Sequence, residues 1–368
     1  MNSALIAHLE AQAASATTEV ARLSYRAQWA CAAARLGQIP RARSEIEALR
    51  SKNTAYVPEV TAWILLAEGM ADHFESLSAT ALDRFKRAYG LAIALGNSDI
   101  RSTAAAWMGA SEFLQAKYET AAEHALEAIE HAPADNPLAK ARAHLVLANC
   151  LNGAAGAPDL ARLHYAKARQ FSVEARDISM QSVVLYNVAT FHVSRISIDD
   201  AFGDPVEDEC SVAELEVNSI DNLDSGLGLE SLQAMVPLLR AELHLIRKQW
   251  LDADALYAKF TLEATTHGQT HQGPRFLAER AQCQAMLGQR ESAARIAAEA
   301  IERLVGRIDA DDNAACHARL SLCFAYLGDG AASRNHRDVA LRSRAEFAEF
   351  QRELRPKIVS IAGGVLDE

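Results

Sequence analysis

The sequence predicts an all-α fold, built as a stack of antiparallel helical hairpins. Hydrophobic residues make up 50% of the 368 residues and aromatic residues only 6%, so the apolar content is mostly Ala and Leu, which favour helices. No run of alternating β-branched residues is long enough to predict a strand. A pattern of small residues also recurs about every 40 residues, which is typical of a repeat array.

The clearest copy of the repeated unit is the segment YETAAEHALEAIEHAP at residues 118–133. Its residues Ala121, Ala125 and Ala128 put small side chains on one face of a helix. Met108–Gly109 stands where a preceding helix would cross that face. Because small residues allow close packing, these two segments are predicted to form one hairpin.

Each copy of this unit consists of a first and a second helix. We mark each copy by the first small residue of its second helix. The markers are about 40 residues apart, except that the step from Ala201 to Ala253 holds about 12 extra residues. They are Ala42, Ala81, Ala121, Ala161, Ala201, Ala253, Ala293 and Ser333. The sequence therefore predicts about eight hairpins in a right-handed α-solenoid, in which each hairpin touches only its neighbours.

The spacing also predicts where the helices lie. First helices are expected near residues 17–36, 56–72, 99–115, 137–152, 178–195, 227–248, 272–287 and 312–327. A short turn and a second helix follow each, and Leu-Gly marks three of these turns, at residues 36–37, 287–288 and 327–328. The last helix, from about 331 to 353, is longer and is expected to cover the exposed end of the stack.

One segment interrupts the repeat. Pro205 stands where the second helix after Ala201 should continue, and residues 196–239 contain no Lys or Arg but eleven acidic residues. Its sequence indicates a solvated loop followed by a short helix. Ser211 and Glu214, three residues apart, form a capping-box pattern at the start of this helix. Three readings stay open, namely a soluble insertion, a contact surface for a basic partner and a cation site. The contact residues would be Asp204, Glu207, Asp208, Glu209, Glu214 and Glu216.

The interruption divides the predicted solenoid, which is otherwise continuous, into three regions. N-terminal hairpins are expected in residues 1–195, the acidic insert with its short helix in 196–226, and C-terminal hairpins with a capping helix in 227–368. The net charge of −11 argues against a nucleic-acid partner, because phosphate binding needs a concentrated basic face. No apolar run is long enough to span a membrane, the N-terminus lacks the pattern of a signal peptide, and the six cysteines form no CxxC pair. We therefore expect a cytoplasmic protein without membrane contact.

The motifs of known chemistry are incomplete. Asp309, Asp311 and Asn313 begin like a calcium loop, but Ala314 stands where the turn needs Gly. His267 and His271 have metal-ligand spacing but no completing ligand. The sequence contains no nucleophile motif, phosphate-binding loop or dinucleotide fingerprint. We expect no enzyme, no metal and no cofactor.

The repeated pattern resembles that of tetratricopeptide repeat proteins over roughly residues 17–345, and its period is similar to that of the longer-helix members found in bacterial regulatory and sensory proteins. The resemblance implies a curved superhelix with a concave face that binds an extended peptide, a partner helix or a small signal molecule. The Lys/Asn/Arg set with which some members hold a terminal carboxylate is not complete here. Transferred to this chain, the groove-facing positions are Arg142, Leu145, Asn149, Asn152, Tyr186, Asn187, Thr190, Glu242, Arg275 and Gln282.

Three hypotheses of function follow. The first is a non-enzymatic protein- or peptide-binding module with a regulatory or scaffolding role. The second is a receptor for a small molecule or signal peptide that transmits binding through solenoid curvature to a separate output protein. The third is a structural subunit that uses its acidic insert against a basic surface, which in a homodimer would be the Arg-rich last helix of another copy, with Arg334, Arg337, Arg342, Arg344 and Arg352.

Overall fold

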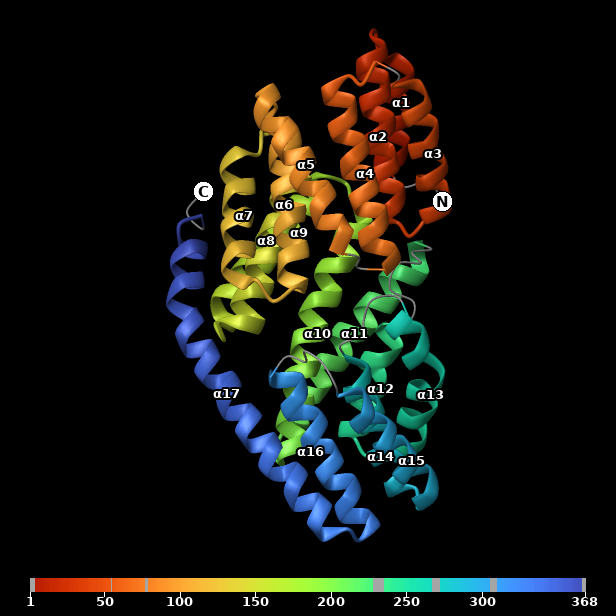
Figure 1. Cartoon of the computed structure of the whole chain (residues 1–368), viewed down its shortest axis with the longest axis vertical. Coiled ribbons are helices and arrows are strands. Elements are labelled where there is room, and N and C mark those ends of the chain that lie inside the picture. The colour runs from red at the N-terminus through yellow and green to blue at the C-terminus, as the bar shows by residue number, and fades with distance from the viewer. Residues whose placement is uncertain are drawn as a thin grey trace. The chain divides into compact units, whose positions relative to one another are not determined.

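The computed structural model describes residues 4–53, 55–76, 79–227, 235–266, 272–304 and 310–365, and Figure 1 shows its helices in chain order. Every regular element in these residues is helical, which confirms the all-α prediction. None of the helices in these ranges is long and apolar enough to cross a membrane. The helices are α1 (Ala4–Ser15), α2 (Glu19–Arg35), α3 (Ile39–Lys52), α4 (Pro58–Ser76), α5 (Ala79–Leu95), α6 (Ser98–Leu114), α7 (Tyr118–His131), α8 (Pro137–Asn149) with the π-helical turn η1 (Cys150–Ala154), α9 (Pro158–Glu174), α10 (Ile178–Phe202), α11 (Glu207–Leu227), α12 (Val236–Ile246), α13 (Trp250–Thr266), α14 (Gly273–Met286), α15 (Arg290–Arg303), α16 (Ala310–Leu327) and α17 (Gly330–Gly363).

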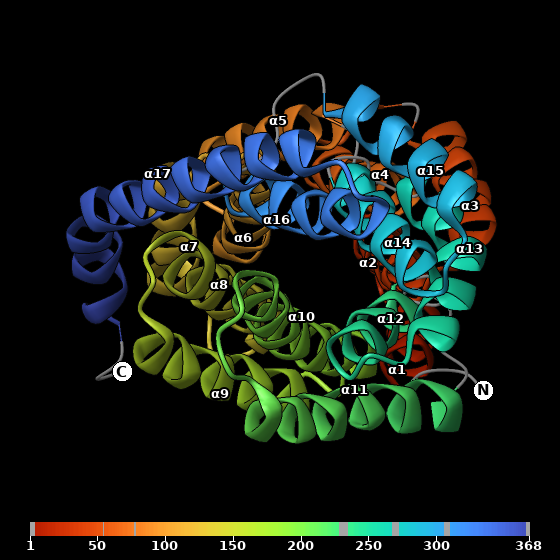
Figure 2. The same cartoon turned by 90° about the horizontal axis from the view of Figure 1, so that it is seen from below.

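Helices α2 to α17 follow one another along the chain in the order that eight pairs require, and α1 precedes them without having been predicted. Neighbours in the chain pack on each other, as α4 does with α5, α6 with α7 and α14 with α15. Helices α6, α7 and α8 lie side by side in both views (Figures 1 and 2).

Local sequence signals start and end these helices. The side chains of Thr18, Asn97 and Asn136 accept hydrogen bonds from backbone N–H groups three residues on, at the starts of α2, α6 and α8. At the Leu-Gly turns, Gly37 and Gly288 have φ of 80° and 77°, in the left-handed region where glycine carries no steric cost. The capping and turn residues therefore fix the hairpin spacing.

Close helix packing explains the repeated small residues. A Cβ added at Gly109 would lie 2.8 Å from the backbone oxygen of Ala121, so α6 and α7 touch where the sequence predicted. The markers Ala42, Ala161 and Ala293 are fully buried.

The chain divides into two compact units. The first contains residues 1–184, 224–231 and 352–368, and the second contains 185–223 and 232–351. A continuous core in the first unit runs from Ile6 to Met108. In the second unit, Val193, Val217 and Leu243 belong to a core that joins α10, α11 and α12. The predicted boundaries at residues 195 and 226 stay predictions.

The interruption of the repeat differs in detail from the expectation. Helix α10 runs on through Ala201, so this residue ends a first helix and does not begin a second. Gly203, with a φ of 87°, and Pro205 then stop it. Helix α11 begins at Glu207, so Ser211 lies within it and is not a cap. Acidic residues in the first turn of α11 favour this earlier start, because they interact well with the positive end of the helix.

The last helix, α17, extends about ten residues beyond its predicted end and contains Pro356. Its residues up to Gln351 belong to the second unit, and those from Arg352 belong to the first. Within the first unit, Ile358 and Ala362 are buried, and Lys357 forms an ion pair of 2.8 Å with Glu119.

Candidate functional site

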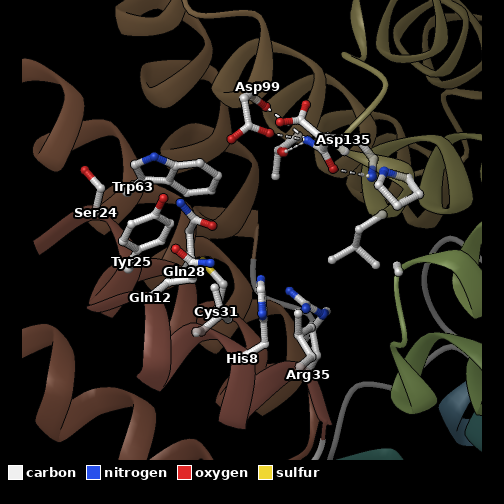
Figure 3. A pocket seen from close by; sticks show the side chains of 18 of the residues that line it. His8, Gln12, Ser24, Tyr25, Gln28, Cys31, Arg35, Trp63, Asp99 and Asp135 are labelled. Carbon is white, nitrogen blue, oxygen red and sulfur yellow. Dashed lines mark hydrogen bonds between the residues drawn. The ribbon is translucent and has the colours of Figure 1, made fainter. Parts of the chain in front are cut away.

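The first unit contains a cavity of about 800 Å³, lined by α1, α2, α4, α6 and α8 and by the turns that precede α8 and follow α9. Figure 3 shows Tyr25, Gln28 and Arg35 from one side of it and Asp99 and Asp135 on another. Pockets that hold small ligands usually measure about 300 to 1,000 Å³. The cavity is therefore large enough for a small molecule or a short peptide.

Aromatic rings form part of the cavity wall. Tyr25 on α2, Trp63 on α4 and Trp107 on α6 all line it, and the two tryptophans are almost fully buried. The ring of His73 meets Trp107 edge-on, with centroids 5.2 Å apart. Burial, and next repulsion from Arg142, lower the pKa of His73 to about 3, so this ring is neutral at pH 7.

Arg142 on α8 puts a buried cation into the cavity wall. The residue is 7% exposed, and its guanidinium carbon lies 4.2 Å from the centre of the Trp107 ring. Its Nε is buried without a hydrogen-bond partner, and no carboxylate in the described ranges lies within ion-pair distance of it. Burial, and next repulsion from Arg35, lower its pKa to about 9, which leaves it charged at pH 7. A cation–π contact offsets only part of the cost of burying such a charge.

A neighbouring arginine differs because it has a partner. Nε and Nη2 of Arg35 donate to Oδ2 of Asp177 at 3.1 and 2.9 Å, and both side chains are about 95% buried. Oδ1 of Asp177 accepts from Oγ of Ser179 and from the backbone N–H of Met180. Burial alone would raise the pKa of Asp177, but Arg35 and these hydrogen bonds hold it below its usual value. Asp177 also attracts the charge of Arg142, but it pairs with Arg35, so Arg142 has no carboxylate within ion-pair distance in the described ranges.

The cavity also has an acidic side. Asp99 in the first turn of α6, Asp135 before α8 and Glu59 in the first turn of α4 line it. Nδ2 of Asn136 donates to Asp99, and Oγ of Ser24 donates to Glu59 at 3.1 Å. Burial, with repulsion from Asp135 and Glu59, raises the pKa of Asp99 to about 6 although Asn136 opposes this. None of the three carboxylates forms an ion pair with a described residue.

The sequence placed Arg142 in a binding groove, and the structure puts it in this cavity. It does not bring the other expected residues of the first unit there. Tyr165 donates to Oδ1 of Asn149 at 2.9 Å and also interacts with Asn152, so these two amides serve the packing of α8 on α9. Leu145 is buried in the core.

The expected groove residues of the second unit surround a much smaller space. Tyr186, Thr190, Glu242 and Arg275 line a cavity of about 20 Å³, which holds about one water molecule. Asn187 is half-buried on the same helix as Tyr186. This space is too small for a ligand of the size that the first cavity accepts.

Arg275 lies at the centre of a buried ionic network in the second unit. It donates to Glu242, to Glu279 and Asp312 at 3.1 Å each, and to Oγ of Ser194 at 2.7 Å. Burial, with repulsion from Glu279 and Asp312, raises the pKa of Glu242 although Arg275 opposes this. A further hydrogen bond joins Gln282 to Arg319, so the polar groups of this region are used inside the unit.

Some of the acidic residues between α10 and α12 form ion pairs within the second unit, and others are exposed without one in the described residues. Arg344 pairs with Asp204 at 3.0 Å, His192 with Glu216 at 2.9 Å and Arg247 with Glu214 at 2.8 Å. Arg195 pairs with Glu209. Glu207 and Asp208 are exposed and form no ion pair with the described part of the chain. Much of the acidic charge is therefore neutralised within the second unit.

The incomplete chemical motifs lie partly outside the residues that the structure describes. No three His, Cys, Asp or Glu side chains in the described ranges are placed to hold a metal ion. His267, His271 and Asp309 lie outside those ranges. Burial raises the pKa of Cys31, which lines the cavity, to about 12, so its thiol is neutral at pH 7.

Sequence reasoning missed Arg35, Asp99 and Asp177. Arg35 and Asp99 stand at the ends of predicted first helices, where the repeat pattern assigns no functional role. Their charge was the available signal.

Comparison with protein-family models found no model that matches the chain. A search of curated proteins also found no match.

Proposed function

We propose that this chain is a non-enzymatic receptor, which binds a small molecule or short peptide in the cavity of its first unit. The supporting observation is a ligand-sized cavity whose wall contains a buried guanidinium without a carboxylate partner. A protein gains little stability from an uncompensated buried charge, so Arg142 is better explained as a group that awaits a ligand.

The receptor would be a right-handed solenoid of tetratricopeptide-like hairpins and would act in the cytoplasm. Elements from four successive hairpins line the cavity. A ligand that contacts them all would therefore favour one curvature of the hairpin stack over others. A separate output protein would read this change, in line with a regulatory or sensory role.

A thermal-shift experiment tests the proposal. The full chain is mixed with fractions of a small-molecule extract from its source cells, and a ligand that binds only the native state raises the melting temperature. Ala21 lines the cavity on α2, so Ala21→Phe fills part of it with a ring and should abolish the shift. If no fraction raises the melting temperature of the wild-type chain, the proposal is wrong.

A second candidate function is a protein contact through α11. Val212 and Leu215 are 51% and 68% exposed on this helix, beside the unpaired Glu207 and Asp208. An apolar pair with an acidic border suits a partner with a basic, apolar surface. Such a partner would serve the scaffolding role, and the exposed Arg334, Arg337 and Arg342 on α17 of a second copy offer one such surface.

Ionic strength and charge reversal test this contact. The variant Glu207→Lys/Asp208→Lys/Leu215→Ser should lose any partner captured by the wild type, and capture should weaken steeply as salt screens the exposed charges. Sedimentation of the purified chain tests for a homodimer. Capture that is unchanged in the variant and in high salt would exclude α11 as the contact surface.

A further inference from the structure

The cavity holds opposite charges at two separate places. Arg142 on α8 has a positive charge with no carboxylate partner in the described ranges, whereas Asp99, Asp135 and Glu59 have no basic partner there. Within a folded protein such groups normally neutralise each other, since an unpaired buried charge is costly. Here they stay apart, which leaves both available to a ligand.

Helix geometry gives the separation of the two charged places. The side chain of Asn136 caps α8 and donates to Asp99, so the carboxylate of Asp99 lies at the start of this helix. Arg142 comes six residues later on the same helix. At 1.5 Å per residue, the two places are on the order of 10 Å apart along the helix axis.

Each place selects one kind of group. The planar guanidinium of Arg142 suits a carboxylate, with which it forms two parallel hydrogen bonds, and Trp107 holds it from one face. The acidic place suits an amino group, because its carboxylates are not arranged to hold a metal ion. The rings of Tyr25 and Trp63 offer apolar surface to the rest of the ligand.

We propose that the cavity recognises a dipolar ligand, with a carboxylate bound by Arg142 and an amino group bound by Asp99, at places about 10 Å apart along the axis of α8. This inference rests on the proposed receptor function and names its ligand class. Two sources have this chemistry. About three residues of extended peptide span the distance through their free termini, at about 3.3 to 3.6 Å per residue. A linear ω-amino carboxylic acid spans it through its methylene chain.

Two series of probes test the inference by calorimetry on the full chain. The first is ω-aminooctanoate, compared with octanoate and octylamine, which each lack one charge. The second is a randomised tripeptide pool with free termini, compared with N-acetylated and C-amidated pools. The dipolar member of at least one series should bind about tenfold or more tightly than its relatives, as the loss of a charged hydrogen bond predicts. The series that binds identifies the source.

Variants assign the two ends of the ligand. Arg142→Gln should weaken the binding of the dipolar probe and of octanoate by about tenfold and leave the binding of octylamine unchanged. Asp99→Asn should weaken the binding of the dipolar probe and of octylamine and leave that of octanoate unchanged. Arg162→Gln is the matched control, since Arg162 is an exposed arginine on α9. The inference is overturned if neither series binds, if the singly charged probes bind as well as the dipolar one, or if Arg142→Gln has no effect.

The thermal-shift experiment with the extract shows whether the dipolar-ligand inference alone is wrong or whether the receptor function is wrong as well. If Ala21→Phe abolishes an extract-induced shift that survives both Arg142→Gln and Asp99→Asn, the receptor function stands and the dipolar ligand is wrong. If the wild-type chain shows no extract-induced shift and binds no probe, both are wrong.

Discussion

The guanidinium carbon of Arg142 lies 4.2 Å from the centre of the Trp107 ring, and this contact joins α8 to α6 across the wall of the cavity. Arg142 has the aromatic ring but no carboxylate, whereas Arg35 has the carboxylate of Asp177. Two arginines in one region therefore have different roles, which substitution can separate.

Arg142→Met should change the free energy of unfolding of the ligand-free protein by no more than about 1 kcal/mol, or increase it, because it removes a buried unpaired charge and loses only a cation–π contact. Arg35→Met should lower it by about 3 to 5 kcal/mol, because it leaves Asp177 charged, buried and unpaired. Urea denaturation of both variants measures the difference. Equal losses would make Arg142 a structural residue and weaken the receptor proposal.

The stability of the first unit should depend on the ionisation of Asp99. Its pKa is raised to about 6 in the folded state, from 3.8 when exposed, so the folded protein keeps a proton that the unfolded chain has lost. The free energy of unfolding therefore falls as pH rises from about 4 to 6. Asp99→Asn stays neutral, so its stability relative to wild type should rise over this range by about 1 to 3 kcal/mol.

Urea denaturation at several pH values between 4 and 7 tests this dependence on Asp99. The comparison with wild type cancels the contributions of titrating groups that do not interact with Asp99, whereas the repulsion of Asp99 by Asp135 and Glu59 is part of the measured difference. A stability difference that is constant over the range would mean that the folded state does not raise the pKa of Asp99.

Two glycine substitutions test the close packing of the hairpins. Gly109→Ala should destabilise the protein by about 1 to 3 kcal/mol, because its Cβ would lie 2.8 Å from the backbone oxygen of Ala121. Gly90→Ala in α5 meets no atom within 4 Å and should stabilise it by up to about 1 kcal/mol, since alanine favours the helix. Thermal denaturation compares them, and a neutral Gly109→Ala would contradict the packing of α6 on α7.

Substitutions in the ionic network around Arg275 should also differ from one another in how much they destabilise the protein. Arg275→Met leaves Glu279 and Asp312 without their partner and should cost about 3 to 5 kcal/mol. Glu242→Gln should cost less than this at pH 7, because burial raises the pKa of Glu242 and so favours its neutral form.

The pH dependence of Glu242→Gln gives a second readout. Because the folded state raises the pKa of Glu242 above its unfolded value of 4.5, the folded protein holds this proton after the unfolded chain has lost it, and wild-type stability falls as pH rises above about 4.5. The stability of the variant relative to wild type should therefore increase as pH rises from 4.5. A decrease would show that Glu242 is ionised and paired with Arg275.

The sequence predicted the helices well because their signals are local. The small residue at Ala121 recurs with the period of the hairpin, and Gly203 with Pro205 ends α10 through backbone chemistry. The cavity was harder to predict, because it depends on contacts between residues far apart in sequence. The repeat pattern put Arg142 at a predicted groove position, whereas nothing near Arg35 in the sequence indicates Asp177, which lies 142 residues away.

Because Arg35 and Asp177 are far apart in the sequence, their ion pair affects how the first unit unfolds. Hairpins that touch only their neighbours can fray from an end one at a time. Here one oxygen of Asp177 holds the first turn of α10 and the other holds the end of α2, so the loss of either helix leaves a buried charge at the other. Helix α2 and the start of α10 are therefore joined in a single cooperative step, and amide hydrogens in both segments should exchange at similar rates.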